Sequence, residues 1–186
     1  MGFHTFDADG ADRLENAARR YRYCSAEELL GALALSGTEH VADLGSGTGF
    51  YTDDVALHAG SVTAVDVQDA MHDYYREKGV PENVDLVTAE VADLPLADGA
   101  LDAAFSTMTY HEFASEAALA EVRRVLDSGS RFVIVDWSAG GSGEAGPPVD
   151  ERYGVTDATA ALEAAGFDVI SATARSETFL VVATAP

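Results

Sequence analysis

Residues 41–50 read VADLGSGTGF, an apolar segment that runs directly into three glycines at alternate positions. Glycine adopts backbone conformations that other residues avoid, so Gly45, Gly47 and Gly49 predict a sharp turn that a ligand can approach closely. The segment before the turn has the pattern of a strand, and residues 50–58 have that of a helix. This order places the turn at the carboxyl end of a strand, the edge at which parallel α/β sheets hold their ligands.

Strand-like runs alternate with helical patterns along the rest of the chain, which predicts a parallel sheet built from βαβ units. A two-residue link before the last strand suits an antiparallel hairpin and is too short for a crossover helix. We therefore expect a doubly wound, three-layer α/β/α domain whose seven-stranded sheet is mostly parallel, with an antiparallel terminal strand. The expected helices cover 11–23, 26–36, 50–58, 69–78, 115–126 and 156–165, and the expected strands cover 40–44, 61–66, 84–88, 101–106, 131–137, 167–174 and 177–184.

The length of 186 residues, 47% of them hydrophobic, suits one domain with a real core, and we expect a single domain over 1–186. No apolar run reaches 18 residues, and the N-terminal stretch lacks the features of a secretion signal. We therefore expect a cytoplasmic location and no membrane partner. The single cysteine, Cys24, excludes an internal disulfide. Because His4, His58 and His72 lack metal-ligand spacing, we expect them at the surface and predict no metal site.

The charge is strongly unbalanced, with 32 acidic residues against 11 basic ones and a formal net charge of −21. Such a surface repels nucleic acid, so we expect no nucleic-acid partner. The regular apolar pattern argues against disorder. The acidity fits either a partner-binding face or adaptation to high salt. Adaptation to salt is favoured because the acids are spread along the chain and Lys78 is the only lysine.

Two acidic residues accompany the glycine turn. Asp43 precedes the glycines, whose Gly-x-Gly-x-Gly spacing differs from the Gly-x-Gly-x-x-Gly of dinucleotide-binding domains. No Gly-Lys-Ser/Thr follows, so the turn is not a P-loop. An acid beside a close backbone suits a cationic or zwitterionic ligand, with a plain tight turn as the alternative. Asp66 ends the next strand, 17 residues after Gly49, where α/β domains place an acid for ribose hydroxyls; a loop-capping role is the alternative.

These segments together resemble the class I S-adenosylmethionine-dependent methyltransferases over about residues 20–184. The family's first motif, hydrophobic-x-Asp-x-Gly-x-Gly-x-Gly, corresponds to VADLGSGTG at 41–49, and its second-strand acid to AVDV at 64–67. Its third-strand region is similar to EVADLPL at 90–96, and its fourth-strand region to LDAAFSTMTYHEF at 101–113. The early RRYRYCSAEELL is similar to the leading helix of small-molecule members of the quinone-methylase-like group.

The resemblance implies a Rossmann-like sheet that binds S-adenosylmethionine and releases S-adenosylhomocysteine. By the family pattern Asp43 balances the ammonium, Asp66 holds the ribose, and Glu90, where many members have Asp, meets the adenine with the backbone of Val91. The expected cofactor-binding residues are Asp43, Gly45, Ser46, Gly47, Gly49, Asp66, Val67, Glu90, Val91 and Ser106.

The residues that act on the acceptor are less determined by this pattern. His111 follows the fourth strand and is the candidate catalytic residue, as a base, an acceptor contact or a hydrogen-bonding group, with packing at a helix start as the alternative. Tyr21, Tyr110, Trp137 and Arg152 are candidate acceptor-binding residues, with ordinary core packing as the alternative for each.

The resulting hypothesis is a methyltransferase that transfers a methyl group to a small-molecule acceptor by in-line displacement, in which positioning supplies much of the catalysis. With no added domain, an N-terminal helical cap over 1–36 and a flexible loop over 138–155 would form the acceptor pocket. A non-catalytic module that senses S-adenosylmethionine or S-adenosylhomocysteine is the main alternative. A nicotinamide-dependent oxidoreductase is disfavoured by the glycine spacing and by Asp43. The sequence leaves open the acceptor, the methylated atom and a homodimer.

Overall fold

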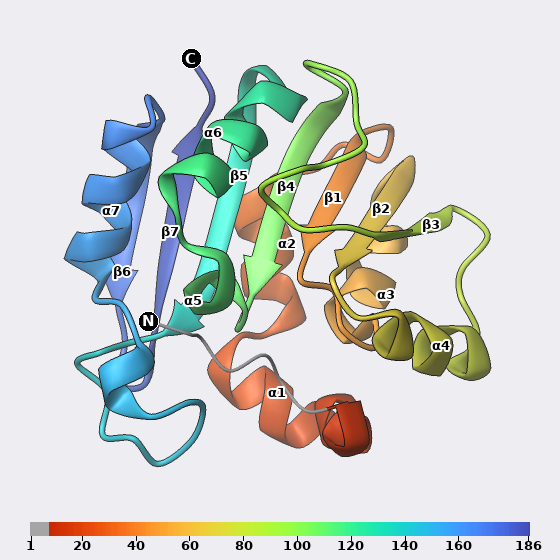
Figure 1. Ribbon diagram of the computed structural model, residues 1–186, viewed down its shortest axis with the longest axis horizontal. Helices are drawn as coiled ribbons and strands as arrows, with labels where there is room; N and C mark the ends of the chain where they lie inside the picture. Colours follow the sequence, from red (N-terminus) through yellow and green to blue (C-terminus); the bar gives the residue numbers. More distant parts are fainter. Residues whose placement is uncertain (1–7) are drawn as a thin grey trace.

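The computed structural model describes residues 8–186 (Figure 1). All strands join one sheet in the order β3-β2-β1-β4-β5-β7-β6. The five strands from β3 to β5 are parallel, whereas β7 runs antiparallel to both of its neighbours. This topology confirms the predicted mostly parallel sheet with its antiparallel terminal hairpin. The strands are β1 (His40–Leu44), β2 (Ser61–Asp66), β3 (Val84–Thr88), β4 (Leu101–Thr107), β5 (Leu126–Trp137), β6 (Asp168–Ala174) and β7 (Thr178–Thr184).

Helices cover both faces of the sheet and complete the three layers (Figure 1). Helices α6 and α7 pack on one face, and α2, α3 and α4 pack on the other. Helix α1 and the 3-10 helix η1 lie beyond the sheet edge at which the parallel strands end (Figure 1). The helices are η1 (Ala8–Glu15), α1 (Ala17–Tyr23), α2 (Ala26–Leu33), α3 (Phe50–Ala56), α4 (Asp69–Lys78), α5 (Tyr110–Phe113), α6 (Glu116–Val125), η2 (Val149–Glu151) and α7 (Val155–Ala164).

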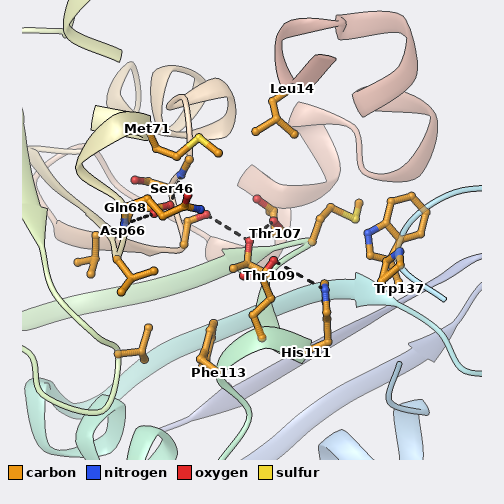
Figure 2. A pocket seen from close by; sticks show the side chains of 18 of the residues that line it. Leu14, Ser46, Asp66, Gln68, Met71, Thr107, Thr109, His111, Phe113 and Trp137 are labelled. Carbon is orange, nitrogen blue, oxygen red and sulfur yellow. Dashed lines mark hydrogen bonds and ion pairs between the residues drawn. The ribbon is translucent and has the colours of Figure 1, made fainter. Parts of the chain in front are cut away.

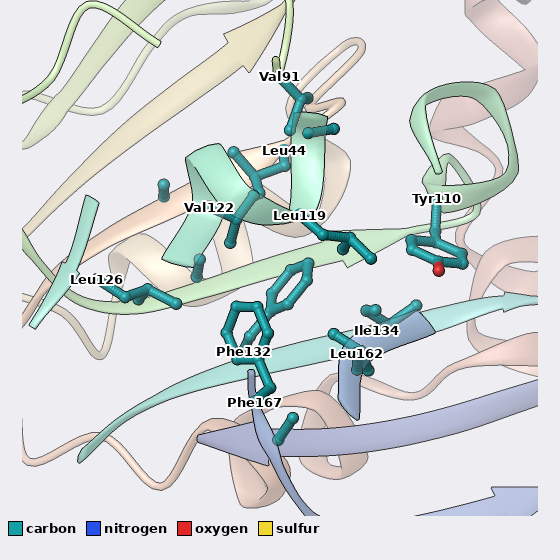
Figure 3. Packing of buried hydrophobic residues seen from close by; sticks show 14 of the residues in the cluster. Leu44, Val91, Tyr110, Leu119, Val122, Leu126, Phe132, Ile134, Leu162 and Phe167 are labelled. Carbon is teal, nitrogen blue, oxygen red and sulfur yellow. The ribbon is translucent and has the colours of Figure 1, made fainter. Parts of the chain in front are cut away.

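The hydrophobic core consists of two clusters, one on each face, because successive side chains of a strand point to opposite sides. In β5, Phe132 and Ile134 join the cluster under α6 and α7, while Val133 and Val135 join the other. Figure 3 shows Phe132 beside Phe167 in the first cluster. A strand buried on both faces reads as a continuous apolar run, which is why these strands could be identified from the sequence.

Four local features differ from the sequence expectations. The helix expected over 11–23 is divided at Asn16, whose side chain accepts a hydrogen bond from the Arg19 N–H (3.1 Å) and begins α1. Strand β5 begins at Leu126 because that residue already pairs with Leu101 across a bulge. The short helix α5 was not expected. His72 is fully buried, because it lies on the stripe of α4 that faces the sheet, whereas His58 is exposed as expected and His4 lies outside the described residues.

Candidate functional site

A cavity of about 980 Å³ opens at the carboxyl ends of the parallel strands (Figure 2). Its floor is formed by the segments that follow β1, β2, β3 and β4. Its walls come from η1 and α1 on one side and from the end of β5 and residues 146–151 on the other. The strand order reverses between β1 and β4, and open α/β sheets hold ligands at such a reversal. This cavity therefore lies where this fold places its ligands.

The glycine turn is held in shape by its neighbours. Gly45 and Gly49 have positive φ values of 83° and 79°. A side chain at Gly45 would collide with Thr109, and one at Gly49 would collide with the ring of Tyr75. Glycine is therefore needed at these two positions for packing as well as for backbone conformation. Gly45 lines the cavity, whereas Gly49 is the N-cap of α3 and lies behind it.

Asp66, at the end of β2, supports the turn and also lines the cavity. Its Oδ2 accepts a hydrogen bond from the Gly47 N–H (2.8 Å), and its Oδ1 accepts one from the Gln68 N–H (2.9 Å). The N–H groups of Gly45 and Ser46 both donate to the carbonyl oxygen of Val65 (2.9 Å each). The turn is thus fixed to β2 by three hydrogen bonds, and the bond from Gln68 holds the Asp66 carboxylate beside the cavity.

Asp43 lies behind the turn, is 1% exposed and does not reach the cavity wall. Its Oδ2 accepts a hydrogen bond from the Thr52 hydroxyl (2.6 Å), while its Oδ1 has no partner among the described residues. Burial raises the pKa of Asp43 to about 7, although the Thr52 hydrogen bond and the nearby Arg20 act in the opposite direction. The buried carboxyl therefore holds its proton more tightly than an exposed aspartate does.

Arg20, from α1, supplies a positive charge at the same end of the cavity. Its guanidinium lies over the rings of Phe50 (5.6 Å) and Tyr51 (4.8 Å), and it lines the cavity. The buried Nε of Arg20 and the buried hydroxyl of Ser46 have no partner among the described residues, as is also true of Asp43 Oδ1. Buried polar atoms are normally paired. Orphaned donors and an orphaned acceptor around one turn fit a ligand group that carries both charges, such as the amino-acid end of S-adenosylmethionine.

On the opposite side of the cavity, His111 of α5 is paired with Asp136 of β5. Nδ1 of His111 lies 3.0 Å from both carboxylate oxygens of Asp136, which is completely buried. Burial alone would lower the pKa of His111, but the hydrogen bond and charge of Asp136, with Glu112 and Glu151, raise it above its ordinary value. Figure 2 shows the His111 ring on the cavity wall between Thr109 and Trp137.

The N-terminal helices are fastened over the cavity by polar contacts. Glu15 of η1 accepts hydrogen bonds from the Thr48 hydroxyl and from Lys78 Nζ (3.3 Å), and the Tyr74 hydroxyl donates to Asp12 (2.9 Å). Leu14 lies above the glycine turn (Figure 2). These contacts join η1 to the turn and to α4, so η1 forms a roof over this half of the cavity.

The segment 138–155 has many internal contacts for a loop that was expected to be flexible. Arg152, only 7% exposed, donates hydrogen bonds to the carbonyl oxygens of Pro147 (2.9 Å) and Ala145 (2.5 Å). Glu177 accepts hydrogen bonds from the N–H groups of Ser142 (2.8 Å) and Gly143 (3.3 Å). The buried side chains of Arg152 and Glu177 each bind backbone groups of the loop. The guanidinium of Arg152 makes its hydrogen bonds within the loop, and Arg152 does not line the cavity.

The structure brings together nine of the residues expected in the site. They line the cavity and are Gly45, Ser46, Gly47, Asp66, Val67, Glu90, Val91, His111 and Trp137. Six others do not line it. Asp43 and Gly49 lie behind the turn and Arg152 lies within its loop, as described above. Ser106 is buried inside β4, and Tyr110 packs in the core against Phe113 and Phe179. The hydroxyl of Tyr21, in α1, donates a hydrogen bond to Asp54 of α3 (2.8 Å).

Sequence reasoning missed several residues of the site, among them Asp136 and Arg20. Asp136 ends an otherwise apolar strand at the same edge of the sheet as Asp66, and this signal is visible in VIVDW at 133–137. Arg20 had no comparable signal, because its approach to the turn depends on how α1 packs. Within residues 8–186, no cluster of three His, Cys, Asp or Glu side chains could hold a metal ion, and no helix is long and apolar enough to cross a membrane.

Comparison with known proteins agrees with this geometry. A family model described as "Methyltransferase domain" matches residues 42–134, half of the chain. An uncharacterized methyltransferase-like protein of Schizosaccharomyces pombe is 32% identical over 132 residues, which cover 70% of this chain and 50% of that protein. A protein of Talaromyces variabilis named as an S-adenosyl-L-methionine-dependent Diels-Alderase is 32% identical over 117 residues, 59% of this chain and 40% of that protein.

Among solved structures, a SAM dependent methyltransferase from Aquifex aeolicus superimposes with a TM-score of 0.86 and 29% sequence identity, over 98% of this chain and 100% of that one. The chain spans about half or less of the length of the curated relatives that it matches first. The matched segment contains the glycine turn, Asp66 and His111, which are the residues around which the cavity is built. The chain belongs to the class I S-adenosylmethionine-dependent methyltransferases.

Proposed function

We propose that this protein binds S-adenosylmethionine in the cavity and transfers its methyl group to a small-molecule acceptor by in-line displacement. The observation that carries the proposal is the division of one cavity into two chemically different halves. One half is built from the glycine turn, Asp66 and Arg20, and the other from His111 and Trp137. An in-line transfer needs a donor site and an acceptor site that share one space.

In the proposed complex, different residues of the donor half would contact the ribose, the adenine and the amino-acid end of S-adenosylmethionine. Asp66, whose carboxylate accepts one hydrogen bond from Gly47 and one from Gln68, would also accept from the ribose hydroxyls. Val91 and the exposed Val67 would enclose the adenine near Glu90. The orphaned polar atoms of Arg20, Ser46 and Asp43 would meet the carboxylate and ammonium, the last through water because Asp43 lies behind the wall. The cofactor supplies an electrophilic methyl group, and the chain supplies its position.

The acceptor half supports a small substrate. It is bounded by Tyr23 and Arg19 of α1, by Trp137, and by residues 146–148 of the loop. Ligand cavities for small molecules are about 300–1,000 Å³ in volume, so a cavity of about 980 Å³ that also holds a nucleoside leaves room for a small acceptor only.

A second candidate is a module that binds the cofactor without transferring a methyl group. It is favoured by the Talaromyces relative, whose name describes a Diels-Alderase that depends on S-adenosyl-L-methionine. It predicts saturable cofactor binding with no acceptor-dependent consumption. The two candidates share the donor half of the cavity and differ only in what occupies the acceptor half.

The first test is isothermal titration of S-adenosylmethionine and S-adenosylhomocysteine into the wild type and Asp66→Ala in high KCl. We expect saturable binding that weakens at least about tenfold in the variant, equivalent to about 1.4 kcal/mol, because both the ribose contact and the support of Gly47 are lost. Asp168→Ala, at an exposed position on the edge strand β6, is the matched control and should bind like the wild type.

The contrary outcomes have distinct meanings. A folded protein that binds neither compound but binds a nicotinamide dinucleotide would overturn the proposal. Saturable binding followed by no transfer of labelled methyl to any member of an acceptor library would select the non-catalytic module instead.

A further inference from the structure

His111 and Asp136 are arranged for proton transfer. We propose that Asp136 positions His111 as the base that removes a proton from the acceptor, so the acceptor carries a dissociable proton on the atom that is methylated. This inference rests on the methyl transfer proposed above and adds a substrate class to it. It also assigns a positioning role to Asp136, which is outside the cavity wall.

The Asp136 carboxylate accepts hydrogen bonds from two backbone N–H groups and also contacts the His111 ring. One carboxylate oxygen accepts from the backbone N–H of His111 (2.6 Å), and the other accepts from the backbone N–H of Trp137 (2.8 Å). Both oxygens lie 3.0 Å from Nδ1 of the His111 ring. No arginine or lysine within residues 10–186 forms an ion pair with Asp136, so His111 is the group that compensates this fully buried carboxylate.

The hydrogen-bond pattern determines which nitrogen is available to a substrate. A carboxylate accepts hydrogen bonds, so Nδ1 of His111 carries the proton and Nε2 of the neutral ring has a free lone pair. Nε2 lies on the cavity side, 3.9 Å from Oε1 of Glu112, which also lines the cavity. The charged groups that face the ring are Asp136 from β5, Glu112 from α5 and Glu151 from η2. All three are acids, and each stabilises the imidazolium that forms when Nε2 takes a proton.

The ring contacts of two other histidines, His40 and His72, differ from those of His111. His40 uses both ring nitrogens, one with the carbonyl oxygen of Ala100 (3.0 Å) and one with the Thr63 hydroxyl (2.8 Å). His72 contacts the Thr88 hydroxyl (3.2 Å), and burial lowers its pKa. Neither imidazole ring has a carboxylate partner among the described residues, and neither histidine lines the cavity. Among the described histidines, His111 alone combines a carboxylate partner with a position on the cavity wall.

The chemistry balances without a further reactant. A lone pair on the acceptor atom forms the new bond to the methyl carbon, the carbon–sulfur bond breaks, and its electron pair remains on sulfur. The acceptor proton moves to Nε2 of His111, and the resulting imidazolium lies beside Asp136. Hydroxyls, phenols, and primary or secondary amines carry the required proton. Thioethers and tertiary amines carry none, so they have no use for this base.

The sharpest test separates the base from the packing role of the same side chain. His111→Asn keeps a donor near the position of Nδ1, so it should retain the contact with Asp136 while removing the base at Nε2. We expect unchanged affinity for S-adenosylhomocysteine and a loss of methyl transfer of about 100-fold or more. The probe is methyl-labelled S-adenosylmethionine with a panel of small phenols, primary amines, tertiary amines and thioethers. His58→Asn, at an exposed histidine, is the matched control.

Asp136 is tested by a readout that does not depend on an acceptor. The protein is labelled with nitrogen-15 at its histidine rings and studied by NMR. The ring resonances that are absent from the spectrum of His111→Asn are assigned to His111. We expect a wild-type pKa above the ordinary value of about 6.5 and a neutral ring with its proton on Nδ1. Asp136→Asn should lower that pKa, and the acid limb of the transfer rate should move to lower pH with it, because the base form of His111 then persists to lower pH.

Several outcomes would overturn the proposal. They are a neutral ring with its proton on Nε2, a pKa of His111 that does not respond to Asp136→Asn, full transfer activity in His111→Asn, or label found only on thioethers and tertiary amines. If the wild type fails to bind S-adenosylhomocysteine, the proposed function itself has failed, and the ring titration still shows whether the pair is arranged as a base. If Asp136→Asn does not fold, His111→Asn and the wild-type titration still decide.

Discussion

Asp43 carries its carboxyl at a place where the fold makes a charge costly. The group is almost completely buried, and one hydroxyl is its only hydrogen-bond partner among the described residues. A carboxyl whose pKa is higher in the folded chain than in the unfolded chain binds its proton more tightly when folded. Its contribution to stability is therefore present at pH values below its unfolded pKa and is lost as the pH rises through about 7.

The loss of stability with rising pH predicts the effect of Asp43→Asn on the cofactor-free protein. The neutral amide can still accept from Thr52, so the variant should melt higher than the wild type at pH 8, and this difference should shrink by a few degrees at pH 5, closer to the unfolded pKa. A few degrees is the effect of about 1 kcal/mol in a domain of this size. Thermal melts of both proteins in molar KCl measure it. Equal melting temperatures at both pH values would show that Asp43 is charged throughout or is solvated.

At the residue scale, the sequence predicted those parts of the site that depend on backbone conformation and strand ends. Gly45, Gly47 and Asp66 line the cavity because a turn after a strand must lie at the ligand-binding edge of the sheet. Arg20 and Asp136 could not be assigned in the same way. The pair of Asp136 and His111 joins residues 25 positions apart in sequence, and only the pairing of β4 with β5 brings them together.

At the element scale, η1 is joined to the glycine turn and to α4 by polar side-chain contacts. Its links to the rest of the fold include the contacts of Glu15 with Thr48 and Lys78 and the hydrogen bond from Tyr74 to Asp12. The contacts of Glu15 are partly buried and the Tyr74–Asp12 hydrogen bond is exposed, and single polar contacts of these kinds contribute little net stability. The roof over the glycine turn can therefore be loosened without unfolding the domain.

We predict that Glu15→Ala weakens S-adenosylhomocysteine binding through faster dissociation, with little change in melting temperature. The roof loses its connection to the turn at Thr48, while the sheet and both core clusters are unchanged. Stopped-flow dissociation with the ligand in excess measures the rate. Glu163→Ala, at an exposed position on α7, is the control. An unchanged dissociation rate in Glu15→Ala would mean that η1 does not close the cavity.

The elements themselves were mostly predictable, and the exceptions have physical causes. Strands β1, β2 and β3 occupy the expected ranges because central parallel strands read as apolar runs. The division of the first helix at Asn16 was missed because an N-cap inside a helical pattern looks like an ordinary polar position. The flexibility that the glycines and prolines predict for the loop 138–155 stays a prediction, whereas the hydrogen bonds of the loop could not be predicted. The buried Arg152 and Glu177 that organise it lie at its end and beyond it in sequence.

At the scale of the whole molecule, 32 acids against 11 basic residues produce self-repulsion that salt screens. Six of the basic residues form ion pairs with acids within residues 10–186. The acids in these pairs are a minority of the 32 acidic residues in the chain. We interpret this surface as an adaptation to high salt, and the expected cytoplasmic location and the open question of a homodimer stay predictions.

This interpretation predicts that stability rises with salt. Circular dichroism should show a folded protein in molar KCl that loses structure as KCl is lowered, because the Debye length grows from about 3 Å at 1 M to about 30 Å at 0.01 M and more acids then repel one another. Sucrose at matched osmolality, which adds no ions, serves as a comparison for effects other than screening. A spectrum that stays intact at low KCl would contradict the adaptation.

Trp137 is the single tryptophan of the chain, and it lies on the wall of the acceptor half. The ring of Tyr23 packs against it at 4.7 Å, the Arg152 guanidinium is 5.6 Å from it, and Gly146 leaves no room between the loop and the indole. Any molecule that enters this half changes the surroundings of the only indole in the protein. The intrinsic fluorescence of the unmodified chain is therefore an optical sensor of the acceptor site, and candidate acceptors can be ranked by titration before any turnover is observed.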